Sequence, residues 1–507
     1  MPTYTIHVLN SAGTIVAILA NTGNYADFTK IDYRLALNDV DSCAIALAPN
    51  SGKIEQCITG QKVRIYRDGA LQFSGIISRA AWKINIDPKG DTYEMDCLGG
   101  GVYLDWRVIL PASGQPYDER TDNADDLAKA YVTANASSTA TVVARRFTDL
   151  TVQANSGSCT SWTEQPRYDN LLDEVKKLAE LGAFDWRVVP TSTGFEFQTA
   201  FPDWGSDRTW GNGVNADAVF TVDRRNFEWM SYNTDTLDHR NYIYVLGQGE
   251  GADQVVRERP ANEDISAYRR REKVISATAY EDNTALDYIG DMELRKMKVI
   301  EGLDVRPLNT TYKNPWDLGD IVTIKANRYG WTYTTEAKVM AVNITVGADG
   351  VEVVDPEMKI LSNSVTNPDF MDAGSGGKVF DGWEDDGPAP LIDETTIVFR
   401  ASLHACKLLK TIAGNCITKQ ASKPVTPSSL YRMDVWSYGN GTHQGYMRLA
   451  DNVGTTVTTN LPSAAGWSKT THYLRVAGTA ATVDITCGMT AAVGAYVIIG
   501  YVNVRKV

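Results

Sequence analysis

Two groups of adjacent acidic residues are the first place to look for catalysis. Asp125 and Asp126 form one group, and Glu384, Asp385 and Asp386 form the other. A glycoside hydrolase needs two carboxyl groups about 5–10 Å apart across a sugar cleft. Adjacent acids in loops are instead typical of a solvated surface. We therefore expect neither group to be catalytic, and we predict that the chain is not an enzyme.

The common catalytic and metal-binding motifs are missing from the sequence. It has no GxSxG or HExxH motif, no phosphate-binding P-loop and no dinucleotide-binding glycine motif after a strand. The 5 histidines are far apart, and the 7 cysteines contain no CxxC pair. We therefore expect no catalytic residue, no metal site and no cofactor. We expect reduced, buried thiols. Cys406 and Cys416, on neighbouring apolar segments, are the one pair that could form a disulfide.

The best candidate for a binding surface is a segment in which aromatic and charged residues alternate with apolar ones. Tyr431, Met433 and Val435 are expected to face a core, so the residues between them face outward. A turn at residues 439–441 would then lead into the strand 446–449. In this hairpin Trp436 would lie beside Tyr446, because residues 436 and 446 would pair.

The outward residues of this hairpin form a candidate glycan-binding face. Trp436 and Tyr446 would be stacking platforms, with Arg432, Asp434 and Arg448 as hydrogen-bonding partners and Asp434 opposite Arg448. Aromatic rings stack on the C–H faces of sugars, while charged groups bind their hydroxyls. An outward Trp436 should contribute to binding and little to stability. An ordinary amphipathic sheet or a contact between subunits would show the same alternation, and both readings stay open.

The elements that would position such residues are mainly strands. A hairpin is predicted from Lys62–Arg67 through the turn Asp68–Gly69 into Leu71–Ile77. Helical periodicity occurs in three segments, which are expected to pack on a sheet: Ala124–Ala136, Asp169–Leu181 and Thr284–Lys298.

The order of these elements predicts a mainly β protein with several domains, since 507 residues exceed one domain. Two small β-barrel domains would flank an α+β insertion, and a β-sandwich with jelly-roll topology would follow. The predicted boundaries are 1–105 for the first barrel, 106–225 for the insertion, 226–360 for the second barrel, 361–367 for a linker and 368–507 for the sandwich.

The charge of the chain excludes some partners. Lys and Arg number 49 against 62 Asp and Glu, a net charge of −13. Residues 1–365 carry −14 (37 against 51), and residues 366–507 carry +1 (12 against 11). Such a negative surface repels phosphate backbones, so we expect no sequence-specific nucleic acid as partner. No apolar run approaches the roughly 18–20 residues of a membrane helix, and the start of the chain has no signal-peptide pattern. We therefore expect the chain to fold in a cytoplasm.

Several segments, in chain order, carry a family resemblance. They are Arg34–Leu47, Val63–Ile77, Tyr93–Cys97, Tyr168–Val175 with Phe184–Val188, Asn241–Gly247, Arg269–Lys273 and Trp316–Ile324. In this order they resemble the siphophage tail-hub proteins, which are similar in fold to the baseplate hub of contractile phages. The resemblance covers about residues 1–360. It implies a homotrimer at the virion tail tip, in contact with the distal tail protein, the tail tube and tail fibre or other tail-tip proteins.

The C-terminal part resembles a second family, the jelly-roll carbohydrate-binding modules. The similarity lies in Asn367–Phe370, Gly382–Trp383 and the final strand Tyr496–Val504. Gly500 and Asn503 stand near the position of a calcium-binding Asp in those modules, so the resemblance does not extend to a metal. It implies contact with a host cell-surface glycan. The alternatives are a tail-associated glycan hydrolase or depolymerase, and a purely structural hub whose last domain contacts other tail proteins.

Overall fold

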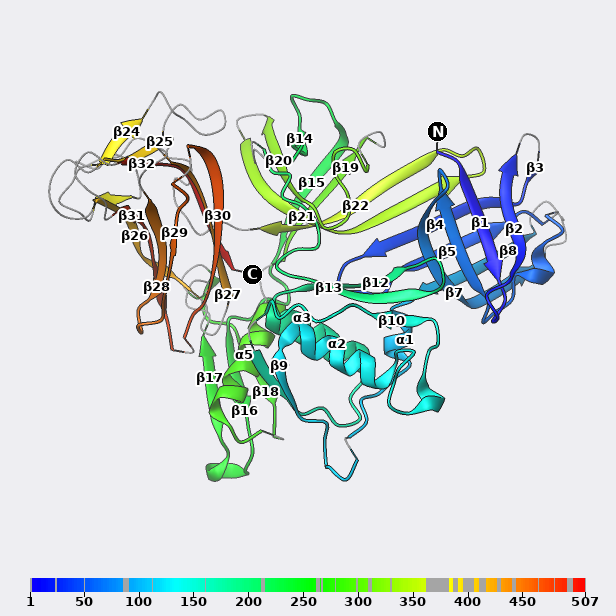
Figure 1. The fold of residues 1–507 in the computed structure, drawn as a ribbon, viewed down its shortest axis with the longest axis horizontal. Helices are drawn as coiled ribbons and strands as arrows, with labels where there is room; N and C mark the ends of the chain where they lie inside the picture. Colours follow the sequence, from blue (N-terminus) through cyan, green and yellow to red (C-terminus); the bar gives the residue numbers. More distant parts are fainter. Residues whose placement is uncertain are drawn as a thin grey trace. The chain divides into compact units, whose positions relative to one another are not determined.

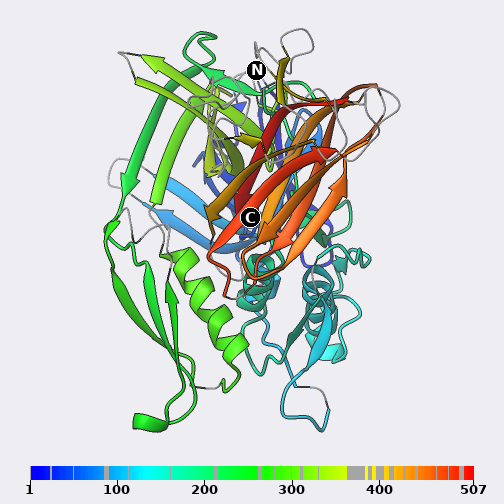
Figure 2. The ribbon, with the colours of Figure 1, turned by 90° about the vertical axis from the view of Figure 1, so that its left-hand side faces the viewer.

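The computed structural model divides the chain into two compact units (Figures 1 and 2). The first unit consists of Met1–Arg208, Ala218–Ser231 and Leu303–Lys359, and the second of Thr209–Asp217, Tyr232–Gly302 and Ile360–Val507. The structure describes residues 2–506 except 23–24, 50, 85–90, 112, 160, 211–214, 261–264, 266–267, 279, 298–299, 309–311, 329–330, 362–382, 386–390, 395–404, 410–415, 426–429, 440–443, 464, 478 and 490–495.

A 14-stranded sheet, called the long sheet below, forms the framework of the first unit. Its N-terminal strands are β1 (Tyr4–Leu9), β2 (Ile15–Thr22), β3 (Tyr25–Ala26), β4 (Phe28–Ala36), β5 (Ser42–Leu47), β6 (Lys62–Arg67), β7 (Ala70–Lys83) and β8 (Thr92–Gly99). Its later strands are β14 (Val219–Thr221), β15 (Phe227–Asp235), β19 (Ile300–Pro307), β20 (Ile321–Arg328), β21 (Trp331–Gly347) and β22 (Glu352–Leu361). The order along the main path is β15-β19-β22-β21-β4-β5-β8-β7-β6-β1-β2-β3.

The pairing of β21 with β4 joins the two ends of this unit. The strands are antiparallel, and Ile344 lies opposite Tyr33. Arg34 adds an ion pair to Glu357, with 3.0 Å between Nε and Oε1. Strands from the two predicted barrels, 1–105 and 226–360, therefore belong to one hydrogen-bonded sheet. The prediction of a mainly β fold is confirmed.

A helical insertion follows the first eight strands. It contains α1 (Val102–Asp105), β9 (Arg120–Asn123), α2 (Ala124–Asn135), η3 (Val143–Arg145), β10 (Leu150–Val152), β11 (Ser161–Glu164), α3 (Leu171–Gly182), β12 (Asp185–Pro190) and β13 (Phe195–Ala200). The side chain of Asn170 accepts hydrogen bonds from the N–H groups of Leu172 and Asp173, which fixes the start of α3. The helix ends where Ala183 adopts a left-handed backbone with φ of 54°.

Three glycines, residues 99–101, connect the end of β8 to the single-turn helix α1. A Cβ atom at Gly100 would lie 2.4 Å from the ring of Phe195, so a larger side chain does not fit there. The glycines thus allow the insertion to pack closely on the end of β8.

A buried lysine ties the insertion to the long sheet. Lys338 Nζ lies 2.6 Å from Asp185 Oδ2 and 2.9 Å from Asp203 Oδ1. Asp185 begins β12 and Lys338 lies on β21, so the ion pairs join two elements far apart in the sequence. Burial alone would lower the pKa of Lys338, but the charges of Asp203 and Asp185 outweigh it and raise the pKa above its usual value.

The second unit contains a small α/β element. Strands β16 (Tyr242–Leu246), β17 (Val256–Pro260) and β18 (Glu272–Ser276) form a sheet in the order β17-β16-β18. Helix α5 (Asn283–Lys296) packs against it, and its Leu286 and Leu294 form a core with Ile243 and Val245. A short turn of helix, η4 (Gly251–Asp253), lies between β16 and β17.

The C-terminal part consists of two five-stranded sheets that share one core. One sheet contains β23 (Glu384–Asp385), β26 (Cys416–Pro424), β31 (Thr482–Met489), β28 (Gly445–Asp451) and β29 (Thr456–Asn460), in that order. The other contains β24 (Leu391–Glu394), β25 (Ala405–Leu409), β32 (Tyr496–Lys506), β27 (Leu430–Gly439) and β30 (Gly466–Arg475). Trp383, from the Gly-Trp motif, is 1% exposed and belongs to this core.

Some sequence expectations concern residues outside the described part. The linker 361–367 is described only at Leu361, which ends β22, and the motif 367–370 lies outside entirely. Cys406 is buried, and Cys406 and Cys416 lie on strands of different sheets. Among the described helices, none is long and apolar enough to cross a membrane.

Candidate glycan-binding face and buried acidic pair

The predicted hairpin of residues 431–449 does not form. Strand β27 pairs with β30 and β32, whereas β28 pairs with β29 and β31 in the other sheet. Trp436 is opposite Lys469, and Tyr446 is opposite Asn460. The pairing of residues 436 and 446, and that of Asp434 with Arg448, are therefore wrong. Consecutive strands of a sandwich can belong to different sheets, and the turn residues do not distinguish this connection from a hairpin.

The polar and aromatic side chains of β27 that were expected to face solvent are buried. Met433 and Val435 face the shared core, as expected, and the residues between them face the other side of the sheet. These residues are nevertheless buried: Arg432 is 6% exposed, Asp434 3% and Trp436 3%. Strand β27 is flanked by β30 and β32 on its two edges, so neighbouring side chains can cover its polar face.

The charged residues on β27 bind each other instead of being open to solvent. Arg432 Nε donates to Asp434 Oδ1 at 3.0 Å, and Thr471 Oγ1 donates to the same oxygen at 2.6 Å. A buried, hydrogen-bonded ion pair is costly to open, because each charge would lose its partner in a poorly solvated place. The geometry gives Arg432, Asp434 and Trp436 a structural role.

Tyr446 and Arg448 are less buried than the three predicted residues on β27. Both are half-buried on β28 and alternate with Met447 and Leu449, which face the core. The ring of Tyr446 lies over Gly488 of β31, because a Cβ atom at Gly488 would be 2.5 Å from both Cζ and Oη of the tyrosine. Arg448 is next to Tyr446 on the same face and opposite Thr486 of β31.

This smaller face can offer an aromatic ring and a guanidinium to a sugar. Arg448 Nε is itself buried and has no hydrogen-bond partner among the described residues, so only the terminal nitrogens of the guanidinium are candidates for binding. The contact between Gly488 and the ring of Tyr446 was not predicted. The signal for it is an isolated glycine inside a strand pattern, which indicates close approach of another group. Two of the five predicted residues thus share a face, and the other three belong to the opposite sheet.

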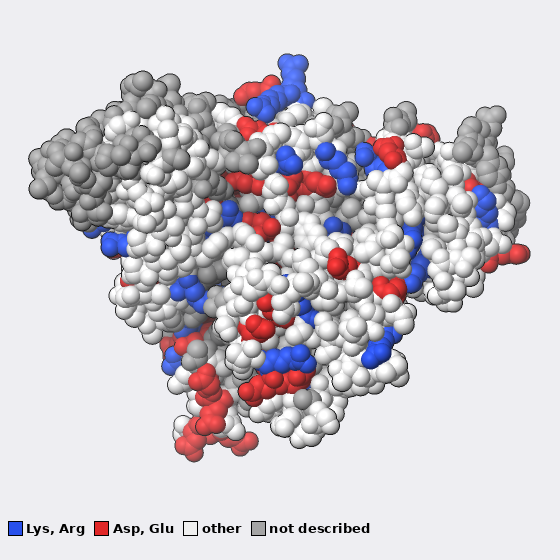
Figure 3. Space-filling view, viewed as in Figure 1, with Lys and Arg blue, Asp and Glu red and all other residues white. Residues whose placement is uncertain are grey.

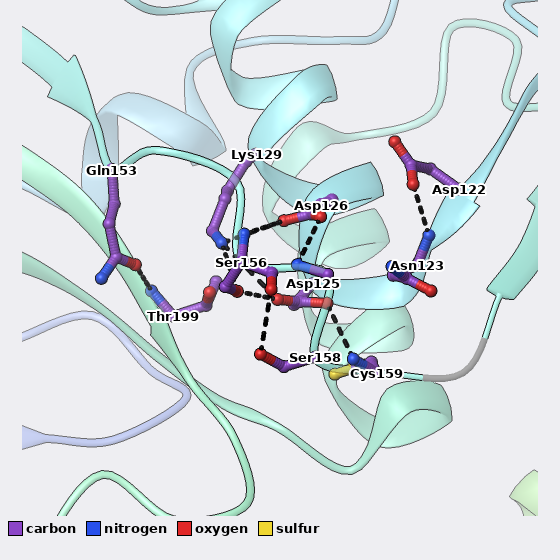
Figure 4. Close-up of polar contacts among 11 residues, drawn as sticks. Asp122, Asn123, Asp125, Asp126, Lys129, Gln153, Ser156, Ser158, Cys159 and Thr199 are labelled. Carbon is purple, nitrogen blue, oxygen red and sulfur yellow. Dashed lines mark hydrogen bonds and ion pairs between the residues drawn. The ribbon is translucent and has the colours of Figure 1, made fainter.

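The acidic pair at the start of α2 also differs from expectation. Asp125 is 1% and Asp126 3% exposed, so the interpretation as a solvated surface is wrong. Lys129, one turn further along α2, is 1% exposed, and its Nζ lies 3.1 Å from Asp126 Oδ1 and 3.5 Å from Asp125 Oδ2. Figure 4 shows these side chains directed toward the segment that contains Ser156.

Hydrogen-bond donors from residues 156–159 occupy the carboxylate oxygens (Figure 4). Asp125 accepts from Ser156 Oγ at 2.5 Å and from the N–H of Cys159 at 3.2 Å. Asp126 accepts from the N–H groups of Ser156 at 3.0 Å and Gly157 at 2.8 Å. These bonds hold residues 156–159 against the N-terminus of α2, where the helix dipole also favours negative charge.

The electrostatics of Asp125 fit a structural role better than acid catalysis. Burial alone would raise its pKa, but the hydrogen bonds from Ser156 and Cys159 and the charge of Lys129 outweigh burial and hold the pKa below its usual value. A general acid for glycoside hydrolysis needs a raised pKa instead. Of the other acidic group, Glu384 and Asp385 form strand β23 opposite Lys419 and Thr418.

Comparison with known proteins identifies the family. Residues 18–358 match the model for the Siphovirus ReqiPepy6 Gp37-like protein. The chain belongs to this family. The predicted relationship to phage tail proteins is thereby confirmed. The matched region covers the insertion and the long sheet, except for β1 and the ends of β2 and β22. No curated protein matches the sequence.

Solved structures similar to this Gp37-like chain include two tail proteins. The tail protein from Neisseria meningitidis MC58 is 14% identical, with a TM-score of 0.44, and the match covers 70% of this chain and 97% of that one. The prophage MuSo2 43 kDa tail protein from Shewanella oneidensis is 10% identical, with a TM-score of 0.46, over 70% and 98% of the two chains. The module TmCBM61, solved with β-1,4-galactotriose, is 14% identical, with a TM-score of 0.24, over 29% and 99%.

Proposed function

We propose that this chain is the hub at the tail tip of a long-tailed phage, where three copies form a ring beneath the tail tube and the distal tail protein. The observation that carries this proposal is the family match over residues 18–358, which includes nearly all of the long sheet. A sheet that continues around a ring leaves few free strand edges, which suits a tube-like part of a particle. The hub is assembled in the host cytoplasm and contains no catalytic residues.

The number of copies tests the ring. Mass photometry of the purified chain and of particles should give three copies per tail, and electron microscopy should show a ring. Six copies, or a chain that remains monomeric inside an intact tail, would contradict the proposal.

In the same proposal, the C-terminal sandwich contacts a host cell-surface glycan through the face of Tyr446 and Arg448. A ring and a guanidinium on one face suit stacking on a sugar and binding its hydroxyls. Glycan-array binding and retention on host cells test this proposal. Tyr446→Ala is the variant, and Tyr438→Ala on the other sheet is the control. Equal retention of both variants would favour a contact with tail fibre or other tail-tip proteins.

A glycan hydrolase is the alternative that the acidic pair first suggested. Asp125 and Asp126 are buried and bound by protein donors, so they do not supply a pair of carboxylates across a cleft. Release of reducing sugars from host envelope by the purified chain would nevertheless contradict a non-enzymatic hub.

A further inference from the structure

Three segments of the helical insertion lie side by side and form one continuous surface. Arg145, at the end of η3, donates through Nη2 to the carbonyl of Val108, and Arg107 Nε donates to the carbonyl of Arg145 at 3.0 Å. On the other side, the N–H of Tyr168 donates to the carbonyl of Ile109 at 2.9 Å. Residues 106–109 therefore lie between residues 142–147 and residues 167–170.

Large apolar side chains are exposed on all three segments. Trp106 is 48% exposed, Val108 40%, Val143 70% and Tyr168 59%. Single exposed apolar residues are common, but a contiguous group is typical of an interaction surface. Together with the exposed Arg146 and Arg167, these four residues are called the arginine patch below. Trp, Tyr and Arg are the residues most enriched at the energetic centres of protein interfaces.

A stack of aromatic rings supports the patch from below. Tyr103 and Phe147 are parallel, with centroids 3.9 Å apart, and the guanidinium of Arg107 lies 3.9 Å from the Phe147 centroid. Trp106 packs beside them, 5.8 Å from Tyr103. The patch is therefore held by packed side chains and needs little ordering when a partner binds, which favours affinity.

Neither arginine of the patch, Arg146 or Arg167, forms an ion pair with a described residue, although two exposed carboxylates, Asp105 and Asp169, lie at its border. Arg107, Arg145 and Arg146 donate to neutral oxygens: the carbonyls of Arg145, Val108 and Ala140, the carbonyl of Trp106, and the side chain of Asn135. Burial lowers the pKa of Arg145, and the nearby charge of Arg107 lowers it further. A partner that supplies carboxylates would relieve this repulsion, so charge complementarity favours an acidic surface.

An acidic surface with apolar neighbours exists on the same chain, in the second unit. The turn between β16 and β17 carries Glu250 and Asp253, both exposed, and Val256 follows with 48% exposure. Figure 3 shows acidic side chains gathered at the tip of this hairpin. Neither carboxylate forms an ion pair with a described residue, so the turn matches the arginine patch in charge and in apolar character.

We propose that the arginine patch of one copy binds the turn 250–253 of a second copy. The inference rests on the proposed trimeric hub and assigns its contact surfaces. Because the two surfaces differ, the contact is heterologous, and it closes into a ring when the rotation between copies is 120°. Exposed valines around the arginines favour a protein partner over a nucleic acid, which the net charge of −13 also repels.

Charge reversal on both surfaces tests the contact with the full chain. The double variant Arg146→Glu with Arg167→Glu should raise the dissociation constant of the trimer at least tenfold in sedimentation experiments. The double variant Glu250→Arg with Asp253→Arg on the other surface should have the same effect. Combining all four substitutions should restore most of the wild-type affinity. Arg224→Glu, an exposed arginine outside the patch, is the matched control, and thermal unfolding checks that each variant is folded.

The possible outcomes distinguish a failure of the proposed contact from a failure of the proposed trimeric hub. A trimer that tolerates reversal of the patch overturns the contact and leaves the ring intact. Loss of the trimer in each double variant without recovery in the combination also overturns it, because the patch would then bind another surface. A wild-type chain that stays monomeric at all concentrations contradicts both the ring and this contact. Trp106→Ser should weaken the trimer without changing its salt dependence.

Discussion

Tyr446 covers Gly488 so closely that one added methyl group at the glycine would displace the ring. The two residues lie opposite each other on β28 and β31. This contact holds the aromatic ring against the sheet and leaves no room for any side chain beneath it. The exposed side of the ring is then the part that can meet a ligand.

Gly488→Ala tests the positioning of this ring. The new methyl group should push Tyr446 away from the sheet, lower the stability by about 1–3 kcal/mol through overpacking, and weaken retention on host cells. The measurement pairs chemical denaturation with glycan-array binding. Tyr446→Phe is the control, since it keeps the ring. Unchanged binding in Gly488→Ala would show that the orientation of Tyr446 is irrelevant to recognition.

Removing the ring itself should weaken glycan binding without unfolding the sandwich. A stacked ring contributes roughly 1 kcal/mol beyond the area it buries, so Tyr446→Ala should weaken binding several-fold for one copy. Several copies in one particle would amplify the effect through avidity. Retention of whole particles and of the isolated chain on the same host cells measures both quantities.

Trp436→Ala should destabilise the sandwich, contrary to the sequence expectation of little effect. The side chain is 3% exposed, and removing a buried tryptophan costs about 3–5 kcal/mol. Trp436→Phe should cost much less, because it keeps most of the packing. The midpoint of urea unfolding separates the two variants, and equal midpoints would mean that Trp436 is exposed in solution.

The buried pair at the start of α2 makes stability depend on acid. The pKa of Asp125 is depressed in the folded chain, so its contribution is fully present above the unfolded pKa near 3.8 and is lost as the pH falls through the folded value. Asp125→Asn should lower the stability at pH 7 by about 1–3 kcal/mol, through weakened buried hydrogen bonds, and flatten the dependence below pH 4. Asp122→Asn, an exposed neighbour, is the control. Parallel pH curves for wild type and Asp125→Asn would contradict this assignment.

Lys338→Met should destabilise the first unit strongly. It leaves Asp185 and Asp203 without their common cation, and breaking a buried pair costs about 3–5 kcal/mol. Because the pKa of Lys338 is raised, its contribution is present below the unfolded value near 10.5 and is lost only as the pH rises through the folded value. Unfolding at pH 7 and pH 11 measures both effects, with Lys30→Met as an exposed control.

Local patterns in the sequence predicted the helices well, because caps and apolar stripes act within a few residues. Helix α3 was expected at 169–181 and spans Leu171–Gly182, with Asn170 as its cap. The alternation in β27 correctly separated Met433 and Val435 from their neighbours. These features depend on residues close in the chain.

The candidate site was predicted less well, because it depends on contacts between distant residues. The sequence does not reveal that β27 and β28 join different sheets, and this single fact separates Trp436 from Tyr446. In the same way, the donors that bind Asp125 come from residues about 30 positions later. Burial of a polar residue is decided by such partners, so residue type and spacing alone could not show it.

The pairing of β4 with β21 has a consequence for synthesis on the ribosome. The two strands are separated by roughly 300 residues, yet each completes the hydrogen bonding of the other. At the usual rate of about 5–20 residues per second, β4 therefore exists for many seconds before its partner emerges. During that time one edge of the nascent sheet is open to aggregation. We expect host chaperones to be needed for the N-terminal strands until residue 347 has left the exit tunnel.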